Sequence, residues 1–353
     1  MGLNRMLPQD ICDCPRGAHN RITDVPGVTV GHCTIRRGDF CTGVTAIVPQ
    51  PDNVFLQKLP AAVQVINGFG KSTGLVQIDE LGTLETPVLL TNTFAVGTAA
   101  TALIRYMLAR NADIGDTTGT VNPVVLECND GYLNDIRGLP VRERHVRIAL
   151  EAAGPDFAEG AVGAGTGMCC YGLKGGIGTA SRVIELDGGN YTLGCLAMTN
   201  FGALRDLTVG GVAVGRQLTR PQPVPEERGS IIVLLATDLP LDDRQLRRIC
   251  RRASVGITRT GSFIGNGSGE IALAFSTANR VAHYESRAAV PVMRFNENRI
   301  NDVFRMTVSA VEESILSSLT HARTTTGRAG HTRLSLRDAL RRKGVRRSQI
   351  DIW

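Results

Sequence analysis

A Gly-Ser pair, Gly229–Ser230, stands between a charged, proline-rich stretch and a long apolar run, in the sequence EERGSIIVLLATDLP at 226–240. A serine hydroxyl is a potential nucleophile, and a small residue in front of it leaves the preceding carbonyl open to attack. Two interpretations follow from these residues. The pair is either a turn that leads into a buried strand, or a bond that the protein cuts to expose a catalytic serine.

The histidines offer this serine no recognisable base. Six are present, with no H-E-x-x-H motif and no Ser/His/Asp context. A serine hydrolase built on this chain therefore needs another base, and the α-amino group of a serine at a chain start is one known solution. Such an amine titrates near pH ~7.7–8.0, so it accepts a proton close to neutral pH, where a lysine does not.

Three glycine-rich stretches and the cysteines carry weaker signals. GFGKST at 68–73 resembles the end of a phosphate-binding loop, but Val65 stands where that motif requires glycine, so a turn after a strand is predicted. GAGTG (163–167) and GLKGGIG (172–178) indicate tight turns near a site. The nine cysteines are an odd number without zinc-finger spacing, even counting the Cys12-x-Cys14 pair, which predicts free thiols. No cofactor and no metal are expected.

The elements that must position the serine are strands and helices in alternation. Buried strands are predicted at 44–49, 61–68, 86–93, 122–127, 191–200, 230–238 and 270–277, and helices at 94–110, 239–252 and 300–320. The first helix is apolar nearly all round, which favours a place between layers, whereas the last has one apolar stripe. Pro221, Pro223 and Pro225 forbid a helix and predict a surface connector before Gly229–Ser230. The pattern indicates a layered α/β protein.

The positive charge is concentrated at the C-terminus. Residues 322–353 hold nine Arg or Lys and two Asp, a local +7, which leaves 6 − 7 = −1 for the rest of the chain. SLRDALRRKG within this tail predicts a short helix capped by Ser335 and ended by Gly344. A solvated or subunit-bridging tail is expected in preference to nucleic-acid binding. With no apolar run of membrane-spanning length and no secretory signal, a cytoplasmic protein without a membrane partner is expected.

Six motifs in order carry a resemblance that covers about residues 20 to 320. They are ITDVPGVTVGHCTI (22–35), ECNDGYLNDIRG (127–138), GAGTGMCCYGLKGGIGTASR (163–182), LAMTNFG (196–202), ERGSIIVLLATDLPL (227–241) and RTGSFIGNGSGEIALAFST (259–277). Together they resemble the DmpA-type family of self-processing serine aminopeptidases, the L-aminopeptidase/D-esterase and β-peptidyl aminopeptidase group.

The resemblance implies a four-layer α-β-β-α sandwich, N-terminal-nucleophile-like, formed by a single catalytic domain over 1–353. It also implies cleavage at Gly229–Ser230 into an α chain (1–229) and a β chain (230–353). The expected assembly is a homo-oligomer, a tetramer of αβ units. Small peptides, amides or esters that begin with an amino acid, including D- or β-amino acyl groups, are the implied substrates.

Carried over position by position, the resemblance also assigns roles to residues. Ser230 is the implied nucleophile, Ser268 and Glu270 are its hydrogen-bonded helpers, and Asn200 is an oxyanion donor. Glu127 is the implied anchor for the substrate's ammonium group. Certain β-peptidases place a tyrosine two positions after that glutamate; this chain has Asn129 there and Tyr132 further on, and both are expected on the substrate side.

Two other functions compete with an aminopeptidase. One keeps the fold but performs acyl transfer or hydrolyses amide oligomers; those relatives look threonine-based, whereas this chain has Ser230. The other is a non-catalytic protein that binds anions through GFGKST or through the basic tail at 322–353.

Overall fold

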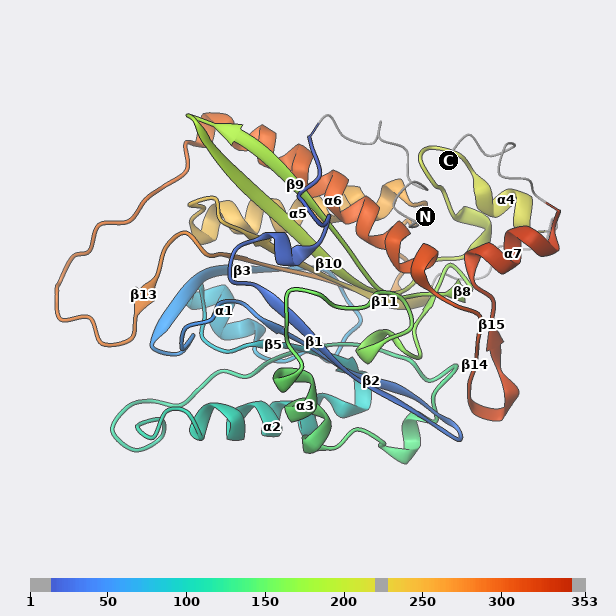
Figure 1. Ribbon diagram of the computed structural model, residues 1–353, viewed down its shortest axis with the longest axis horizontal. Coiled ribbons are helices and arrows are strands. Elements are labelled where there is room, and N and C mark those ends of the chain that lie inside the picture. The colour runs from blue at the N-terminus through green and yellow to red at the C-terminus, as the bar shows by residue number, and fades with distance from the viewer. Residues whose placement is uncertain (1–13, 220–227, 345–353) are drawn as a thin grey trace.

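Two sheets lie face to face, with helices outside both, in the computed structural model, which describes residues 14–219 and 228–344 (Figure 1). The four-stranded sheet has the order β1 (Thr29–Arg37), β2 (Phe40–Val48), β5 (Val88–Asn92) and β6 (Val124–Cys128). The seven-stranded sheet has the order β13 (Val281–Ala282), β3 (Gln57–Gly68), β12 (Gly267–Ser276), β11 (Arg228–Thr237), β10 (Gly189–Asn200) and β9 (Gly176–Leu186), with β4 (Thr83–Leu84) paired to β3.

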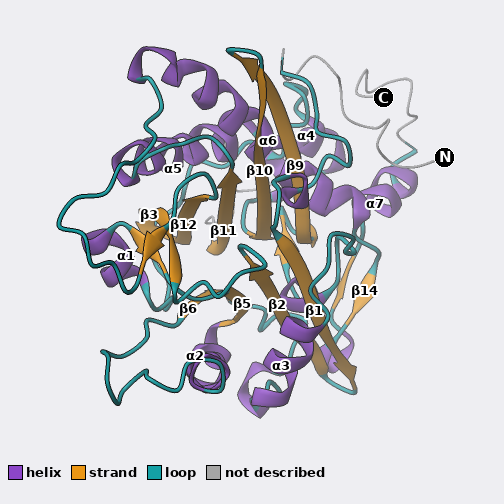
Figure 2. Cartoon of the chain, turned by 60° about the vertical axis from the view of Figure 1, so that its left-hand side comes forward, coloured by secondary structure: helices purple, strands orange, loops and turns teal. Residues whose placement is uncertain are grey.

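Helices form the two outer layers. α5 (Asp243–Arg259) and α6 (Ile300–His321) cover the seven-stranded sheet, while α2 (Val96–Leu108) and α3 (Glu143–Glu151) cover the four-stranded sheet (Figures 1 and 2). Smaller elements are α1 (Leu75–Leu81), α4 (Val214–Leu218), α7 (Leu336–Arg342) and two hairpins, β7 (Cys169–Cys170) with β8 (Leu173–Lys174) and β14 (Thr325–Thr326) with β15 (Thr332–Arg333). The expected α-β-β-α sandwich is confirmed.

The side chains of β11 show why the sheet is covered on both faces. Ile231, Val233 and Leu235 belong to the apolar core beneath α5 and α6. Ile232, Leu234 and Ala236 belong to the core between the two sheets. Because successive side chains of a strand point to opposite faces, an uninterrupted apolar run buries both faces of this strand.

The seven predicted strands all exist, but two long strands, β1 and β9, were not predicted, nor were the two-residue strands. β1 reads TVGHCTIRR and β9 reads GIGTASRVIEL, and both mix glycine and polar residues into the run. The glycine of β9 has a packing reason: a Cβ at Gly178 would lie 2.0 Å from the carbonyl oxygen of Ser314 on α6. Close contact between helix and strand therefore requires glycine here, at the expense of a hydrophobic pattern.

The helices predicted at 94–110, 239–252 and 300–320 correspond to α2, α5 and α6, with differences in extent and burial, while α1, α3 and α4 were not predicted. α5 begins after Asp242, whose side chain accepts from the N–H of Gln245 at 2.7 Å, but it ends at Arg259 and not at 252. The reason is that Ala253 and Ile257 continue its buried stripe. α2 does not lie between layers as predicted: it is an outer helix with exposed residues such as Thr101. Its many small alanines made it look apolar all round.

α6 is the helix that is buried nearly all round, from Met306 to Leu319. The short helix predicted in the basic tail is also confirmed as α7, because Ser335 Oγ accepts from the N–H of Asp338 and Gly344 follows with φ 64°. The cysteines of the described ranges are free thiols, as predicted. Cys12 and the three prolines at 221, 223 and 225 lie outside the described residues. No helix in the described part of the chain is long and apolar enough to cross a membrane.

Candidate active site

Ser230 lies at the start of β11, on the wall of a cavity of about 630 Å³. Its side chain shares the face of Ile232 and Leu234, so it points toward the four-stranded sheet. Only 5 % of the residue is exposed. Its hydroxyl donates a hydrogen bond to the carbonyl oxygen of Gly229 at 2.5 Å, so the hydroxyl lies beside the peptide bond that precedes it.

Gly229 is a position where no other residue fits. Its φ of 141° lies in a region that side chains rarely adopt, and a Cβ would lie 2.0 Å from the carbonyl oxygen of Asn200. The Gly-Ser pair is therefore more than a flexible turn: its glycine is required by backbone conformation and by the neighbouring strand.

Glu127, at the end of β6, brings a carboxylate to the same cavity. It is 3 % exposed and has a hydrogen bond on each oxygen: Oε1 accepts from the backbone N–H of Lys71 at 2.7 Å, and Oε2 from the hydroxyl of Thr93. These bonds fix a negative charge at the wall, which suits a cationic group in the cavity.

The GFGKST stretch forms a turn after β3, as predicted, and serves this carboxylate. In a phosphate-binding loop, the backbone N–H at this position would bind a phosphate. Here the N–H of Lys71 donates to the carboxylate of Glu127. The Lys71 ammonium lies over the ring of Phe69, 4.4 Å from its centroid. Phe69 and Phe263 are exposed aromatic residues of the cavity wall.

Asn200, the last residue of β10, is paired directly with Ser230 in the antiparallel register of β10 and β11. Its Oδ1 accepts from the N–H of Cys169 at 2.9 Å, and its Nδ2 donates to the carbonyl of Asn129 at 3.0 Å. Only one orientation of the amide satisfies both partners. An amide nitrogen carries two hydrogens, and only one of them is used in these two hydrogen bonds. Asn200 is buried beside Ser230 and is not part of the cavity wall.

Ser268 and Glu270 lie on β12, which runs parallel to β11. Gly229 is paired with Ser268 and Ile231 with Glu270, so the two side chains flank the level of Ser230 along the sheet. Both residues are fully buried, and the Ser268 hydroxyl donates to Glu270 Oε1. The structure thus places both residues on the strand next to that of Ser230, and neither is part of the cavity wall.

The two remaining residues predicted for the site, Asn129 and Tyr132, lie in different surroundings. Asn129 lines the cavity, and its Oδ1 accepts from the N–H of Gly131 at 2.9 Å. Tyr132 is not part of the wall: its ring stacks on His331 with centroids 4.8 Å apart, and the Arg333 guanidinium lies 3.6 Å from its centroid. The turn at 129–132 directs Tyr132 toward the C-terminal hairpin, so its expected place beside the substrate is not observed.

Thr93, Phe69 and Phe263 also line the cavity, and they were not predicted as residues of the site. Thr93 and Glu127 are in contact in space but 34 positions apart in the sequence, so no local pattern predicts their hydrogen bond. Phe263 had a weak signal, since it stands in the same motif as Ser268 and Glu270. No group of three or more His, Cys, Asp or Glu within the described ranges is arranged to hold a metal ion.

A four-layer α-β-β-α fold with a serine at the start of a central strand defines a hydrolase of the N-terminal-nucleophile type. The model of peptidase family S58 matches residues 20–333, and the chain belongs to this family. It is a serine aminopeptidase.

Three relatives show how far the similarity extends. A β-peptidyl aminopeptidase, BapA of Sphingosinicella microcystinivorans, is 38% identical over 345 residues, which cover 90% of this chain and 85% of that protein. A crystal structure from Pyrococcus horikoshii has 48% identity and a TM-score of 0.89 over 96% of this chain and 99% of the other. The L-aminopeptidase D-Ala-esterase/amidase of Ochrobactrum anthropi, a variant of the Ntn hydrolase fold, has 38% identity and a TM-score of 0.87 over 97% and 98%.

Proposed function

We propose that this aminopeptidase is made as one chain, cuts its own Gly229–Ser230 bond and then uses Ser230 as the nucleophile. The observation that carries the proposal is the position of Ser230 on one cavity wall with the fixed carboxylate of Glu127. A free serine amine at this point would lie at the start of a rigid central strand, beside its own hydroxyl.

The cleavage step needs only groups already at the bond. Ser230 Oγ attacks the carbonyl carbon of Gly229 and releases its proton, and the peptide C–N bond breaks as the Ser230 nitrogen takes up a proton. The product is an ester between Gly229 and Ser230 Oγ. Water then hydrolyses the ester, which leaves a carboxylate on Gly229 and a free amine on Ser230. The hydroxyl beside the Gly229 carbonyl supports this route.

In the mature enzyme, the Ser230 amine accepts the proton of Oγ as Oγ attacks the substrate carbonyl. Ser268 and Glu270 stabilise the ammonium that forms, a role supported by their buried hydrogen bond. The free N–H of Asn200 stabilises the oxyanion. The ammonium passes its proton to the leaving amine or alcohol, and water releases the acyl group from Ser230.

Substrate selection follows from the walls of the cavity. Glu127 binds the free ammonium of the first residue, which restricts substrates to amides, esters or short peptides with a free amino group. Phe69 and Phe263 favour an apolar side chain next to it. D- and β-amino acyl groups belong to the proposed range, since two relatives are named for β-peptidyl and D-Ala-ester substrates. Asn129 lies on the wall as a further polar contact for the acyl group.

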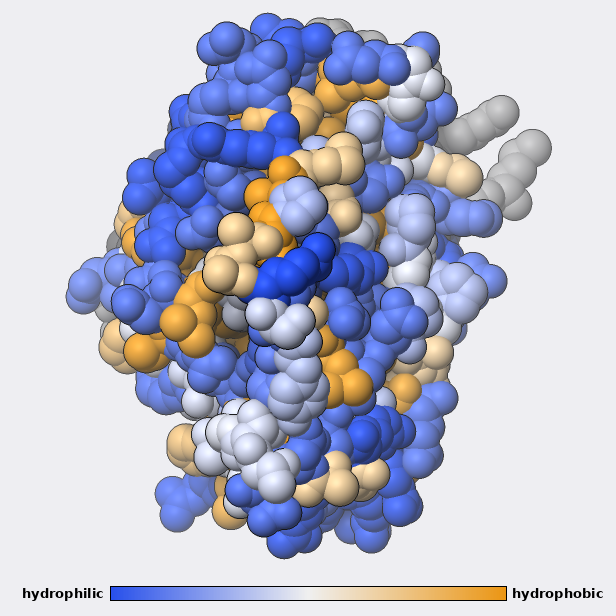
Figure 3. All heavy atoms as spheres, turned by 90° about the vertical axis from the view of Figure 1, so that its left-hand side faces the viewer, coloured by the Kyte–Doolittle hydropathy of each residue, from blue (hydrophilic) through white to orange (hydrophobic). Residues whose placement is uncertain are grey.

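We also propose that αβ units assemble into a homo-oligomer, as a tetramer. The loop after β13 supports this proposal, because it offers an apolar surface for contact between units. Its side chains Tyr284, Val292 and Met293 are 65%, 66% and 64% exposed. Figure 3 shows the face that carries this loop, where apolar side chains lie among polar ones.

The free thiols favour a reducing compartment, the cytoplasm.

The test of the function is direct. Purified protein should give two bands on a denaturing gel, and the smaller band should begin with SIIVLL. Ser230→Ala should stay one chain and should not release an amino acid from aminoacyl p-nitroanilides. Full activity from an uncleaved wild-type chain would contradict the proposal. Product analysis with and without an added amine acceptor separates hydrolysis from acyl transfer.

A further inference from the structure

Lys174, on β8, is a completely buried cation. Its three N–H donors are used on three backbone carbonyls, those of Gly165 at 2.9 Å, Met168 at 2.7 Å and Gly175 at 2.6 Å. No carboxylate of the described residues forms an ion pair with it. Burial lowers the pKa of Lys174 to about 8, because the charged form loses its hydration.

One of these carbonyls belongs to a peptide group that touches the site. The carbonyl of Met168 and the N–H of Cys169 are two ends of the same planar peptide unit. Lys174 holds the oxygen end together with the N–H of Gly175, which donates to the same oxygen at 3.1 Å. The N–H end donates to Asn200 Oδ1 at 2.9 Å. A cation on the oxygen also polarises the unit, which strengthens the N–H as a donor.

Within the described ranges, the Oδ1 of Asn200 accepts this hydrogen bond alone. Its Nδ2 is held separately, by the carbonyl of Asn129. If the Met168–Cys169 peptide group turned, the amide plane of Asn200 would lose one of the two contacts that orient it, and its second N–H would no longer have a fixed direction.

We propose that Lys174 is a positioning residue for the reaction: by holding the Met168–Cys169 peptide group it directs the amide of Asn200 at the developing oxyanion. The inference rests on the proposed role of Asn200 in a Ser230-dependent reaction. Lys174 does not touch the substrate, so its effect should appear in the chemical step and not in the binding of the substrate's ammonium by Glu127.

Lys174→Met tests this, because methionine keeps most of the volume and removes the donors. Loss of a whole oxyanion donor costs roughly 10²–10³ in kcat, so misorientation of Asn200 should lower kcat by about 10-fold to 100-fold. KM should change by less than about threefold. Rates are expressed per cleaved chain. A variant with wild-type kcat, or one in which only KM rises, would overturn the inference.

A double-mutant cycle distinguishes positioning from general structural damage. If Lys174 acts through Asn200, the double variant Asn200→Ala/Lys174→Met should have the same kcat as Asn200→Ala alone. Additive losses would show that Lys174 acts elsewhere. Lys58→Met is the matched control: it removes a largely buried lysine paired with Glu85, remote from Ser230, and should leave kcat unchanged.

Amide hydrogen exchange tests the inference without an activity assay. Amide hydrogen exchange at Cys169 should become faster in Lys174→Met and stay unchanged in Lys58→Met, whether or not the chain has been cleaved. Wild-type protection at Cys169 in Lys174→Met would refute the inference by itself. If Ser230→Ala or Asn200→Ala kept full activity, the proposed function would fail; if they behave as proposed but the cycle is additive, only the role of Lys174 fails.

Discussion

Two acidic residues of the ECND motif, Glu127 and Asp130, are both buried, yet their surroundings differ. Glu127 faces the cavity with a hydrogen bond on each oxygen. Asp130 lies behind it, 1% exposed, with a hydrogen bond from Asn134 at 2.9 Å. Burial raises the pKa of Asp130 to about 7, although hydrogen bonds from Thr42 and Asn134 oppose the shift. The folded protein therefore keeps a proton on Asp130 that the unfolded chain loses.

The consequence is a stability that depends on pH. An aspartate in the unfolded chain has a pKa near ~3.9, so between pH ~4 and ~7 the folded state binds more protons and the contribution of Asp130 to stability falls as pH rises. Asp130→Asn should gain stability relative to the parent over this window and run parallel to it above pH ~7.

The measurement is urea unfolding at several pH values in a Ser230→Ala background, which keeps the chain whole. Asp156→Asn, at a side chain that is 90% exposed, is the control and should run parallel to the parent throughout. A difference between Asp130→Asn and the parent that does not vary from pH 4 to 7 would contradict the shifted pKa.

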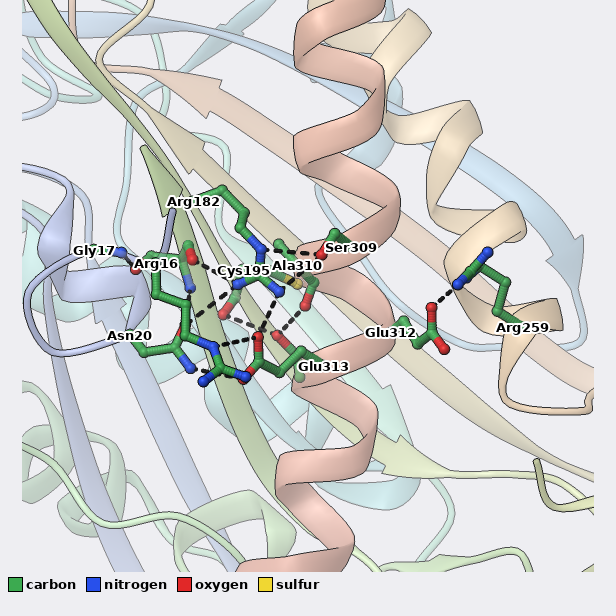
Figure 4. A network of polar contacts seen from close by, with 12 residues as sticks. Arg16, Gly17, Asn20, Arg182, Cys195, Arg259, Ser309, Ala310, Glu312 and Glu313 are labelled. Atoms are coloured by element: carbon green, nitrogen blue, oxygen red, sulfur yellow. Dashed lines mark hydrogen bonds and ion pairs between the residues drawn. The ribbon is translucent and has the colours of Figure 1, made fainter. Parts of the chain in front are cut away.

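α6 packs on β9 and β10 and carries two buried glutamates next to each other, whose partners differ (Figure 4). Glu313 is paired with Arg182 at 2.5 Å and with Arg16 at 2.9 Å, and the Arg182 side chain is 3% exposed. Glu312 is paired with Arg259, whose side chain is 47% exposed. One pair is sealed from water, and the other has a cation that water can reach.

Removal of each carboxylate should therefore have unequal effects. Glu313→Gln leaves the Arg182 charge buried without an anion and should lower the free energy of unfolding by about 3–5 kcal/mol. Glu312→Gln should cost much less, because Arg259 rehydrates. Urea unfolding of both variants in the Ser230→Ala background measures the difference, and equal losses would show that the exposure of the arginine does not decide the cost.

At the scale of the whole molecule, the proposed cleavage falls inside the seven-stranded sheet. Strands β3, β4, β9 and β10 precede Ser230, β12 and β13 follow it, and the cleavage point itself lies near the start of β11. β11 is hydrogen-bonded to β10 on one side and to β12 on the other. α6, from the second part, packs on β9 and β10 from the first, and Glu313 reaches Arg182 and Arg16 across the same boundary.

We expect the two proposed fragments to remain one particle after cleavage. They should co-elute in size-exclusion chromatography under native conditions, at the volume of uncleaved Ser230→Ala, and separate only in denaturant. Light scattering on the same peak gives the mass of the assembly, with four αβ units as the expected value. Fragments that part without denaturant would show that the sheet does not hold them.

Local sequence predicted much of the framework. Apolar runs such as SIIVLLATD located the buried strands, because a strand covered on both faces needs continuous apolar residues. Ser335 marked the start of α7, because helix caps are local hydrogen bonds. The start of α5 was predicted at 239, whereas the helix begins at Asp243. The Gly229–Ser230 pair and the missing histidine base indicated the chemistry of an amine-activated serine.

Local patterns along the chain were enough to predict the kinds of element and the candidate nucleophile, whereas the packing of the layers sets which side chains meet. The pairing of Asn200 with Ser230 and the contact of Thr93 with Glu127 join distant segments through sheet register, which has no local signature. Tyr132 is close to Glu127 in sequence but turns toward His331, whereas Lys174 looked like part of a turn and is the buried cation behind Asn200. Contacts of this kind depend on how layers pack, and packing is a property of the whole fold.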